Sequence, residues 1–268
     1  MIAKCVGAQA INPTAQCSNG PISVIQSGDR NEYKAMLVKL DKRFSNRYQI
    51  TASYALSSLT GFFTGENAND RFGNHGYLDA DARHRFTFSG FLDLPRGFQA
   101  SIIAVFASAP PFNAKLPGTL DINGDGTQGD TLPGLKVNSL GRGTSRKDLI
   151  NLVTAFNATF AGKKDANGAT IPALILPNNF RFGSTFQSED VRLTKTFKLR
   201  ERASVQAFFE VFNLLNIANL GGFTQTLDKV NSDPTKQAFS FGRPSTRIGQ
   251  SFGTGGPRAL QFGGRFSF

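Results

Sequence analysis

Hydrophobic and polar residues alternate along much of this chain, in stretches of about ten residues. In the first of these stretches, Met36, Val38 and Leu40 fall on one side of the alternation. Lys39 and Asp41 fall on the other side. Because successive side chains of a β-strand point to opposite faces of its sheet, this pattern predicts strands with one apolar face and one polar face.

The alternation predicts seven strands, at residues 35–44, 48–58, 83–94, 98–108, 187–199, 203–213 and 260–268. The connections between them alternate in length: short turns lie at 45–47, 95–97 and 200–202, and long connections at 59–82, 109–183 and 217–257. Transmembrane β-barrels have this alternation, with short periplasmic turns and long external loops. The strand lengths also fit, because a tilted strand crosses a bilayer in about 9–11 residues.

The direction of each strand follows from the position of the C-terminus. If the last strand ends in the periplasm, every short turn lies in the periplasm and every long loop lies outside the cell. Strands in a bilayer must form a closed cylinder, and single-chain bacterial barrels have an even number of strands. Seven is odd, so either an eighth strand lies within residues 21–33, around Pro21 to Ile25, or the chain is part of a larger barrel. We therefore expect an all-β fold: an antiparallel transmembrane β-barrel segment with long extracellular loops.

The two faces of the predicted strands face different surroundings. The apolar face, expected to contact lipid, carries Met36, Val38, Leu40, Tyr48, Ile50, Tyr54, Phe86, Phe88, Phe98, Ile102, Phe106, Leu193, Phe197, Phe262, Phe266 and Phe268. The polar face, expected to line the lumen, carries Lys39, Asp41, Arg43, Gln49, Thr51, Asp93, Gln99, Arg192, Gln206, Glu210, Gln261 and Arg265. A soluble β-sandwich is an alternative, in which the apolar face would lie inside a core.

Composition narrows the functional classes. The chain of 268 residues has 30 Lys and Arg against 19 Asp and Glu, a net charge of +11. The basic residues are spread singly and do not form a basic helix or a zinc-finger spacing, so we expect no nucleic-acid partner. The longest apolar run, Ile102 to Ala107, is far shorter than the roughly 20 residues of a transmembrane helix.

Two short segments contain residues typical of a disulfide or of a calcium site. Cys5 and Cys17 are the only cysteines, and they either close a small disulfide loop or remain free thiols. Asp121, Asn123 and Asp125 open a D-x-N-x-D-G sequence, whose alternate oxygen ligands and glycine suit Ca²⁺. Leu132 stands where a calcium loop has its bidentate Glu, so a polar loop tip without a metal is the alternative.

The longest external loop contains a predicted helix. Ser145 and Asp148 form a capping-box pattern, and apolar residues then recur at helical spacing as far as Phe160. The only histidines are His75 and His84, and no nucleophile or paired-carboxylate motif accompanies them. We therefore expect no enzymatic activity and no cofactor other than the candidate calcium ion.

Several segments together resemble TonB-dependent outer-membrane receptors of the Oar-like type. They are DADARHRF at 79–86, FLDLP at 91–95, VRLTKTF at 191–197, EVFNLLN at 210–216 and QFGGRFSF at 261–268. The resemblance runs from about Gly20 to Phe268. It implies a 22-stranded barrel with a plug, which binds and imports a scarce or bulky ligand with energy relayed by TonB.

The chain differs from the whole receptor pattern in its first part. It shows no signal peptide, plug or TonB-contacting segment, so the resemblance implies a fragment: an extracellular loop remnant at 1–33 and the C-terminal part of the barrel at 34–268. Its partners would be outer-membrane lipid and lipopolysaccharide, and TonB through the missing N-terminal region. A stand-alone small outer-membrane barrel, or an adhesin-like binding protein, is the alternative.

The C-terminal strand resembles the signal by which the barrel-assembly machinery recognises outer-membrane barrels. Leu260, Phe262, Phe266 and Phe268 alternate with polar residues, and the chain ends on the aromatic Phe268. An ordinary amphipathic strand is the alternative. Both readings place the protein in the bacterial outer membrane if the barrel topology is correct.

Overall fold

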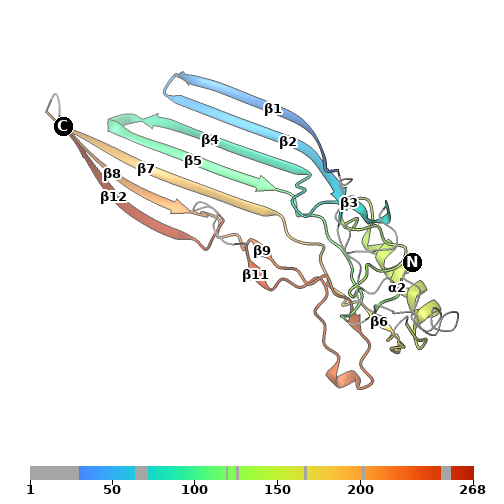
Figure 1. Ribbon diagram of the computed structural model, residues 1–268. Helices are drawn as coiled ribbons and strands as arrows, with labels where there is room; N and C mark the ends of the chain where they lie inside the picture. The colour runs from blue at the N-terminus through green and yellow to red at the C-terminus, as the bar shows by residue number, and fades with distance from the viewer. Residues whose placement is uncertain are drawn as a thin grey trace, which may run out of the picture.

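One broad antiparallel sheet dominates the computed structural model, and long loops fold together at one end of it (Figure 1). The structure describes residues 30–63, 72–118, 120–124, 127–165, 168–200, 203–248 and 255–268. The short turns and the C-terminus lie at the opposite end from the loops. This arrangement agrees with the expected topology, in which every long connection is on the same side.

The sheet contains all seven expected strands. They are β1 (Glu32–Ser45), β2 (Tyr48–Phe62), β4 (His84–Leu94), β5 (Phe98–Ala107), β7 (Phe186–Arg200), β8 (Ala203–Phe212) and β12 (Ala259–Ser267), bonded in that order. The short strand β3 (His75–Tyr77) adds to the end of β2. β1 begins at Glu32, so its first residues fall within the region that we expected to be loop, and β2 runs beyond the expected end at residue 58.

The register confirms the division into two faces. Direct partners in an antiparallel pair point to the same side of the sheet, so a row of partners marks one face. One such row crosses all seven strands: Lys42, Ile50, Gly90, Ile102, Val191, Val211 and Leu260. The neighbouring row on the opposite face contains Ser101, Arg192, Glu210 and Gln261. We call the first face the outer face and the second the inner face.

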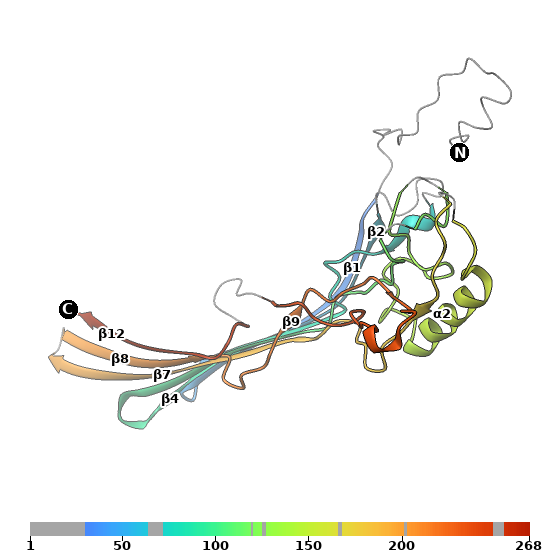
Figure 2. The same ribbon diagram turned by 90° about the horizontal axis from the view of Figure 1, so that it is seen from below.

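The outer face is uncovered in the described part of the chain. Leu40, Phe262 and Phe266 are 65%, 77% and 57% exposed, although they belong to a continuous apolar surface. A soluble protein would cover such a surface, and a second sheet would do so in a sandwich. No second layer packs on it among the described residues (Figure 2), which contradicts the soluble sandwich.

The short turns, at the end of the sheet opposite the loops, have the backbone dihedral angles of tight hairpins. Asn46 and Arg47, between β1 and β2, have φ of 50° and 74°, as a two-residue hairpin with right-handed strand twist requires. The turn from β4 to β5 is the 3₁₀ segment η2 (Pro95–Gly97). The third expected turn lies partly outside the described residues.

A glycine in the last strand makes room for an aromatic ring. Gly263 lies directly opposite Phe208, and a Cβ placed on Gly263 would lie 2.2 Å from the Phe208 ring. The ring covers the glycine on the inner face, and the Arg192 guanidinium lies 4.4 Å from the ring centroid. The neighbouring Gly264 has no such constraint, since a Cβ there would meet its nearest atom at 3.6 Å.

Among the residues that the structure describes, the loops add one helix, two small sheets and two 3₁₀ segments. Helix α2 spans Arg146–Phe160, and the remaining elements are β6 (Leu174–Ile175), β9 (Leu220–Gly221), β10 (Asp228–Lys229), β11 (Thr246–Arg247), η1 (Phe72–Asn74) and η3 (Pro234–Lys236). The pairs β6–β10 and β9–β11 form the two small sheets. Among the described residues, no helix is both long and apolar enough to cross a bilayer.

Candidate functional site

The two longest loops fold into one unit, which we call the loop domain: the described residues of 108–185 and 213–258. Its hydrophobic core joins residues from both loops, so that Leu227 and Phe241 of the second loop pack with the first. The first loop contributes Phe112, Ala114, Leu116, Leu120, Leu132, Leu140, Leu149, Val153, Phe156, Ile171, Leu174 and Phe180. The protein therefore presents a folded, solvent-facing surface at this end of the sheet.

Helix α2 confirms the predicted helix and its cap. The Ser145 side chain accepts a bond from the Asp148 N–H at 3.2 Å, and the Asp148 carboxylate accepts one from the Ser145 N–H at 2.8 Å. The Ser145 hydroxyl also donates to the Asp148 carboxylate at 2.6 Å, and this bond, followed by the bond from the Ser145 N–H, lowers the pKa of Asp148 from its usual value. The helix buries Leu149, Val153 and Phe156 in the core of the loop domain, as the spacing of its apolar residues implied.

Aromatic rings form the centre of the loop domain. The rings of Phe112 and Phe241 meet at 5.6 Å, and those of Phe180 and Phe241 at 5.5 Å. The Arg146 guanidinium lies 4.1 Å from the Phe180 ring centroid, which ties the start of α2 to this cluster. Aromatic pairs at such distances stabilise a core beyond their buried area.

A buried ion pair attaches the loop domain to the sheet. The Arg142 Nε lies 2.6 Å from an Asp81 oxygen, and the side chains are only 6% and 0% exposed. Arg142 also donates to the carbonyls of Asp81 and Ala109, while the second Asp81 oxygen accepts from the Leu59 N–H at 2.7 Å. The carboxylate thus holds the end of β2 and the loop domain together.

Asn138 makes a second attachment next to this pair. Its side-chain amide donates to the carbonyl of Tyr77 and to the Asp79 carboxylate, both at 2.8 Å. Asp79 and Asp81 belong to the segment at 79–86 that carried the family resemblance, and their structural role is to hold the loop domain. The role of Arg142 has no local signature in the sequence, because 61 residues separate it from Asp81.

Two buried asparagines extend the sheet at the end of β7. The Asn219 side chain accepts from the Gln187 N–H at 2.8 Å and donates to the Gln187 carbonyl at 2.9 Å, as a neighbouring strand residue would. Asn213 donates to the carbonyls of Ile217 and Gly256. Asn213 therefore helps to turn the chain out of β8, and Asn219 completes the pairing at the start of β7.

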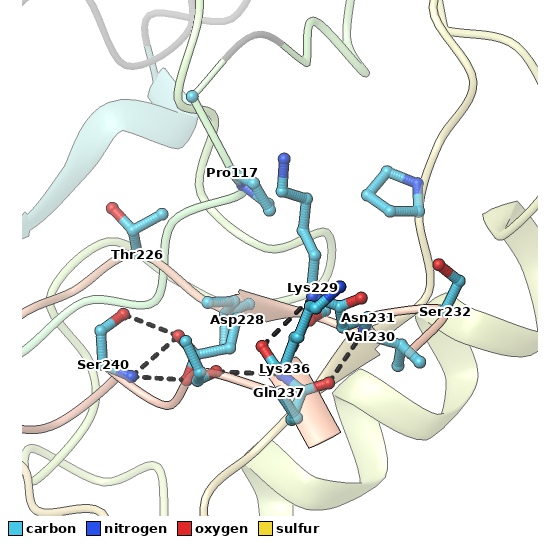
Figure 3. A pocket seen from close by; sticks show the side chains of 14 residues that line it. Pro117, Thr226, Asp228, Lys229, Val230, Asn231, Ser232, Lys236, Gln237 and Ser240 are labelled. Carbon is cyan, nitrogen blue, oxygen red and sulfur yellow. Dashed lines mark hydrogen bonds between the residues drawn. The ribbon is translucent and has the colours of Figure 1, made fainter. Parts of the chain in front are cut away.

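A cavity of about 640 Å³ lies on the loop domain, between the segment 226–240 and two prolines of the first loop (Figure 3). Its wall includes Pro117, Pro172, Val230, Lys229 and Lys236. The volume is within the range of small-molecule sites, which is about 300–1,000 Å³. No lining residue of this cavity was identified from the sequence, since it forms only where the loops meet.

Hydrogen bonds inside the segment 226–241, which we call the hairpin, occupy the acidic group that lines the cavity. The Asp228 carboxylate accepts from the Ser240 hydroxyl at 2.6 Å, from the Ser240 N–H at 2.9 Å and from the Phe241 N–H at 3.1 Å. Gln237 is likewise occupied, because its side chain bonds the Asn231 N–H and the Lys229 carbonyl. Figure 3 shows the bonds from Ser240 to Asp228 and the bonds of Gln237, with the two lysines close by.

The inner face of the sheet is a second polar surface. Thr51 donates to Asp41 at 2.7 Å, and Gln99 donates to Asp93 at 2.8 Å. Arg192 of β7 bonds Glu210 of β8 at 2.9 Å. These bonds connect side chains on neighbouring strands, so six residues of the predicted polar set form paired groups along the face expected to line a lumen.

The described part of the candidate calcium loop is held by its own hydrogen bonds. Asp121 is 2% exposed and accepts from the Gly124 N–H at 2.6 Å. The Asn123 side chain donates to Asp130 at 3.2 Å. Asp125 lies outside the described residues, and within them no group of three or more His, Cys, Asp or Glu side chains could hold a metal. The calcium site therefore stays a prediction.

The remaining predicted residues have these positions. Cys5 and Cys17 lie outside the described residues, so the disulfide stays a prediction. His84 is exposed at the start of β4 and bonds Tyr54 Oη at 2.8 Å. The four residues of the C-terminal signal share the outer face, where the Phe262 ring lies 4.8 Å from that of Phe209.

Comparison with known protein families agrees with this structure. The family model "Outer membrane beta barrel domain" matches residues 2–261, nearly the whole chain. Searches of the curated proteins and of the solved structures gave no match. The family indicates a structural or transport role rather than catalysis. This chain therefore belongs to the outer membrane beta barrel domain family and is located in the bacterial outer membrane.

Proposed function

We propose that this chain forms the C-terminal part of the barrel of a TonB-dependent receptor of the Oar-like type, which binds a scarce or bulky ligand outside the cell and imports it. The proposal rests on the sheet first. All neighbouring strands are antiparallel, so β1 and β12, six steps apart, run in the same direction. A barrel with antiparallel pairing throughout therefore needs an odd number of further strands between them.

The curvature of the sheet favours many further strands over one. Seven strands of an eight-stranded barrel would wrap most of the way around a cylinder and bring β1 near β12. Figures 1 and 2 instead show a shallowly curved sheet with β1 and β12 on its opposite sides. This is the single observation that carries the proposal, and it agrees with the sector of a 22-stranded barrel.

The loop domain supports the binding role. It has its own hydrophobic core and an open cavity, and buried polar bonds attach it to the sheet. A loop that only connected two strands would need none of these. In an outer-membrane barrel, long loops lie outside the cell, so this surface is the first part of the protein that a ligand meets.

Each surface has a proposed partner. The outer face contacts lipid, and lipopolysaccharide contacts this face at the end near the loop domain. The barrel-assembly machinery recognises the strand that ends in Phe268. TonB acts through an N-terminal region of the whole receptor.

Gene deletion tests import directly. Deleting the gene in its own bacterium should remove growth on a nutrient source, and deleting the gene for TonB should remove growth on the same source. A growth defect that appears without any TonB dependence would overturn the proposal.

A second experiment addresses the alternative of a stand-alone small barrel. The purified chain, folded in detergent, should shift little on a gel between unheated and heated samples, because a sector of a large barrel cannot close. A compact, heat-sensitive band that resists protease would favour the small barrel, and a steady conductance in a planar bilayer would support that reading further.

A further inference from the structure

We propose that the cavity on the loop domain binds a small organic carboxylate with a compact apolar body. This inference rests on the proposed function, since it assigns the chemistry of the ligand that the outside surface binds first. The evidence for it is the lysine ammonium groups and apolar side chains that line the cavity, and the positive charge of the loops around the cavity.

The available polar groups of the cavity are chiefly donors. Asp228 is 8% exposed and its oxygens accept bonds from Ser240 and Phe241, so its charge is held within the hairpin. Among the described residues, Lys229 forms no ion pair, and Lys236 forms one exposed pair with Asp233 at 3.3 Å. An exposed pair of this kind contributes little and exchanges readily with another anion. The lysine ammonium groups are therefore free to bind a carboxylate.

Apolar groups line the cavity beside the lysines. Pro117 and Pro172 come from the first loop, and Val230 and Ala238 come from the hairpin. Val230 is 48% exposed, which leaves its side chain open to contact. A ligand that fits this wall has an apolar portion a few carbon atoms across, and its charged group lies toward the lysines. A simple inorganic anion would leave the apolar wall in water.

The charge of the loops favours the same class of ligand. Residues 108–185 and 213–258 contain 13 Lys and Arg against 7 Asp and Glu, so the loops have a net charge of +6. This is more than half of the +11 of the whole chain. A positive surface raises the local concentration of anions and the rate at which they associate.

Fluorine NMR in detergent micelles tests the proposal with a matched pair of probes. 4-Fluorobenzoate should broaden and shift in a saturable way when the folded chain is added. 4-Fluorobenzamide has nearly the same shape without the charge, and it should bind at least about fivefold more weakly. Inorganic phosphate should compete poorly. Equal binding of benzoate and benzamide, or strong competition by phosphate, would overturn the proposed ligand class.

Two double variants locate the binding. K229Q/K236Q should weaken 4-fluorobenzoate binding about fivefold to tenfold, since each exposed charge contributes a modest share. K163Q/K164Q removes the same charge from the same loop domain outside the cavity, and it should change binding less than twofold. An equal loss in both variants would mean that the probe senses only the general positive charge, which would overturn the site.

The outcome is separable from that of the proposed function. If the gene deletion shows TonB-dependent growth but 4-fluorobenzoate does not bind, the carboxylate site is wrong and the receptor role stands. If the probe binds at the lysines but growth is independent of TonB, the site stands and the import role is wrong. Unchanged circular dichroism of K229Q/K236Q shows that the variant is folded.

Discussion

Arg142 and Asp81 show how much depends on a single pair at the rim of the sheet. The two groups are almost fully buried, and Asp81 also accepts a backbone bond from β2. Removing one partner leaves the other charge buried without compensation, which costs about 3–5 kcal/mol. The pair therefore contributes strongly to the attachment of the loop domain to the sheet.

We predict that Arg142→Met loosens the loop domain by about 3 kcal/mol while the sheet stays folded. Limited trypsin digestion of the protein in micelles measures this, because cleavage within 108–185 should accelerate. Lys163→Met is the matched control on an exposed residue of the same loop, and it should leave the digestion rate nearly unchanged. Equal digestion of Arg142→Met and the unmodified chain would contradict the role of the pair.

Gly263 and Gly264 give a second test at the residue scale. Gly263→Ala forces the Phe208 ring off its position, an overpacking that costs about 1–3 kcal/mol. Gly264→Ala meets no atom closer than 3.6 Å and should cost less than about 1 kcal/mol. Urea unfolding in lipid vesicles, followed by circular dichroism, compares the two. Equal loss of stability would show that the ring does not depend on the glycine.

Local sequence patterns predicted the residues whose bonding partners are close in the sequence, and missed those whose partners are far away in the sequence. Ser145 and Asp148 are three positions apart, and their capping bonds agree with the expectation. Asn219 and Gln187 are 32 positions apart, and nothing near Asn219 indicates that its amide completes the pairing at the start of β7.

The strands follow from alternation because each strand has to present two different faces. Within β5, Ile102 faces outward in the row that includes Val191, whereas Ser101 faces inward in the row that includes Arg192. The sequence predicted this division even though Ile103 and Val105 interrupt the pattern, since the neighbouring strands are regular. Strand ends were less predictable: β2 continues to Phe62, because β3 pairs with its final residues.

A charge placed on each face of β5 separates lipid from lumen. Ile102→Arg puts a cation near the middle of the bilayer and should destabilise the folded protein by about 2–4 kcal/mol. Ser101→Arg, one residue away on the inner face, should cost less than about 1 kcal/mol, because that face meets water and polar side chains. Unfolding in lipid vesicles measures both. A larger cost for Ser101→Arg would reverse the assignment of the faces.

Helix α2 depends on its cap for its first turn. Ser145→Ala removes the side-chain oxygen that accepts the Asp148 N–H, which costs about 1 kcal/mol. Hydrogen exchange at residues 146–149 should accelerate in this variant, with little change in the strands. The bonds that the Ser145 hydroxyl and N–H donate to the Asp148 carboxylate lower its pKa, so their contribution to stability is present above the unfolded pKa of about 4 and is lost as the pH falls through the folded pKa. Equal exchange in Ser145→Ala and the unmodified chain would contradict the cap.

At the scale of the whole molecule, the apolar residues of the sheet and those of the loops have different roles. The buried core lies in the loop domain, whereas the outer face of the sheet stays uncovered in the described structure. This division is what a membrane protein requires, because lipid covers the sheet and only the water-exposed part needs a core of its own. The loop domain could not be predicted beyond its helix, since its core joins residues more than a hundred positions apart.

The central claim is that this chain is a sector of a larger barrel, and the two edge strands of the sheet allow it to be tested. β1 and β12 each bond one neighbour, while β4 and β5 bond a neighbour on both sides. In a sector, every second amide of β1 and β12 lacks a partner within the chain. In a small barrel that closes by itself, all strands are bonded on both sides.

Hydrogen exchange of the chain in micelles that each hold one copy tests this claim most directly. The account predicts slow exchange throughout β4 and β5, and fast exchange at alternate amides of β1 and β12. Slow exchange in all four strands would mean that the edges pair within the chain, and the protein would then be a small closed barrel instead of part of a large one.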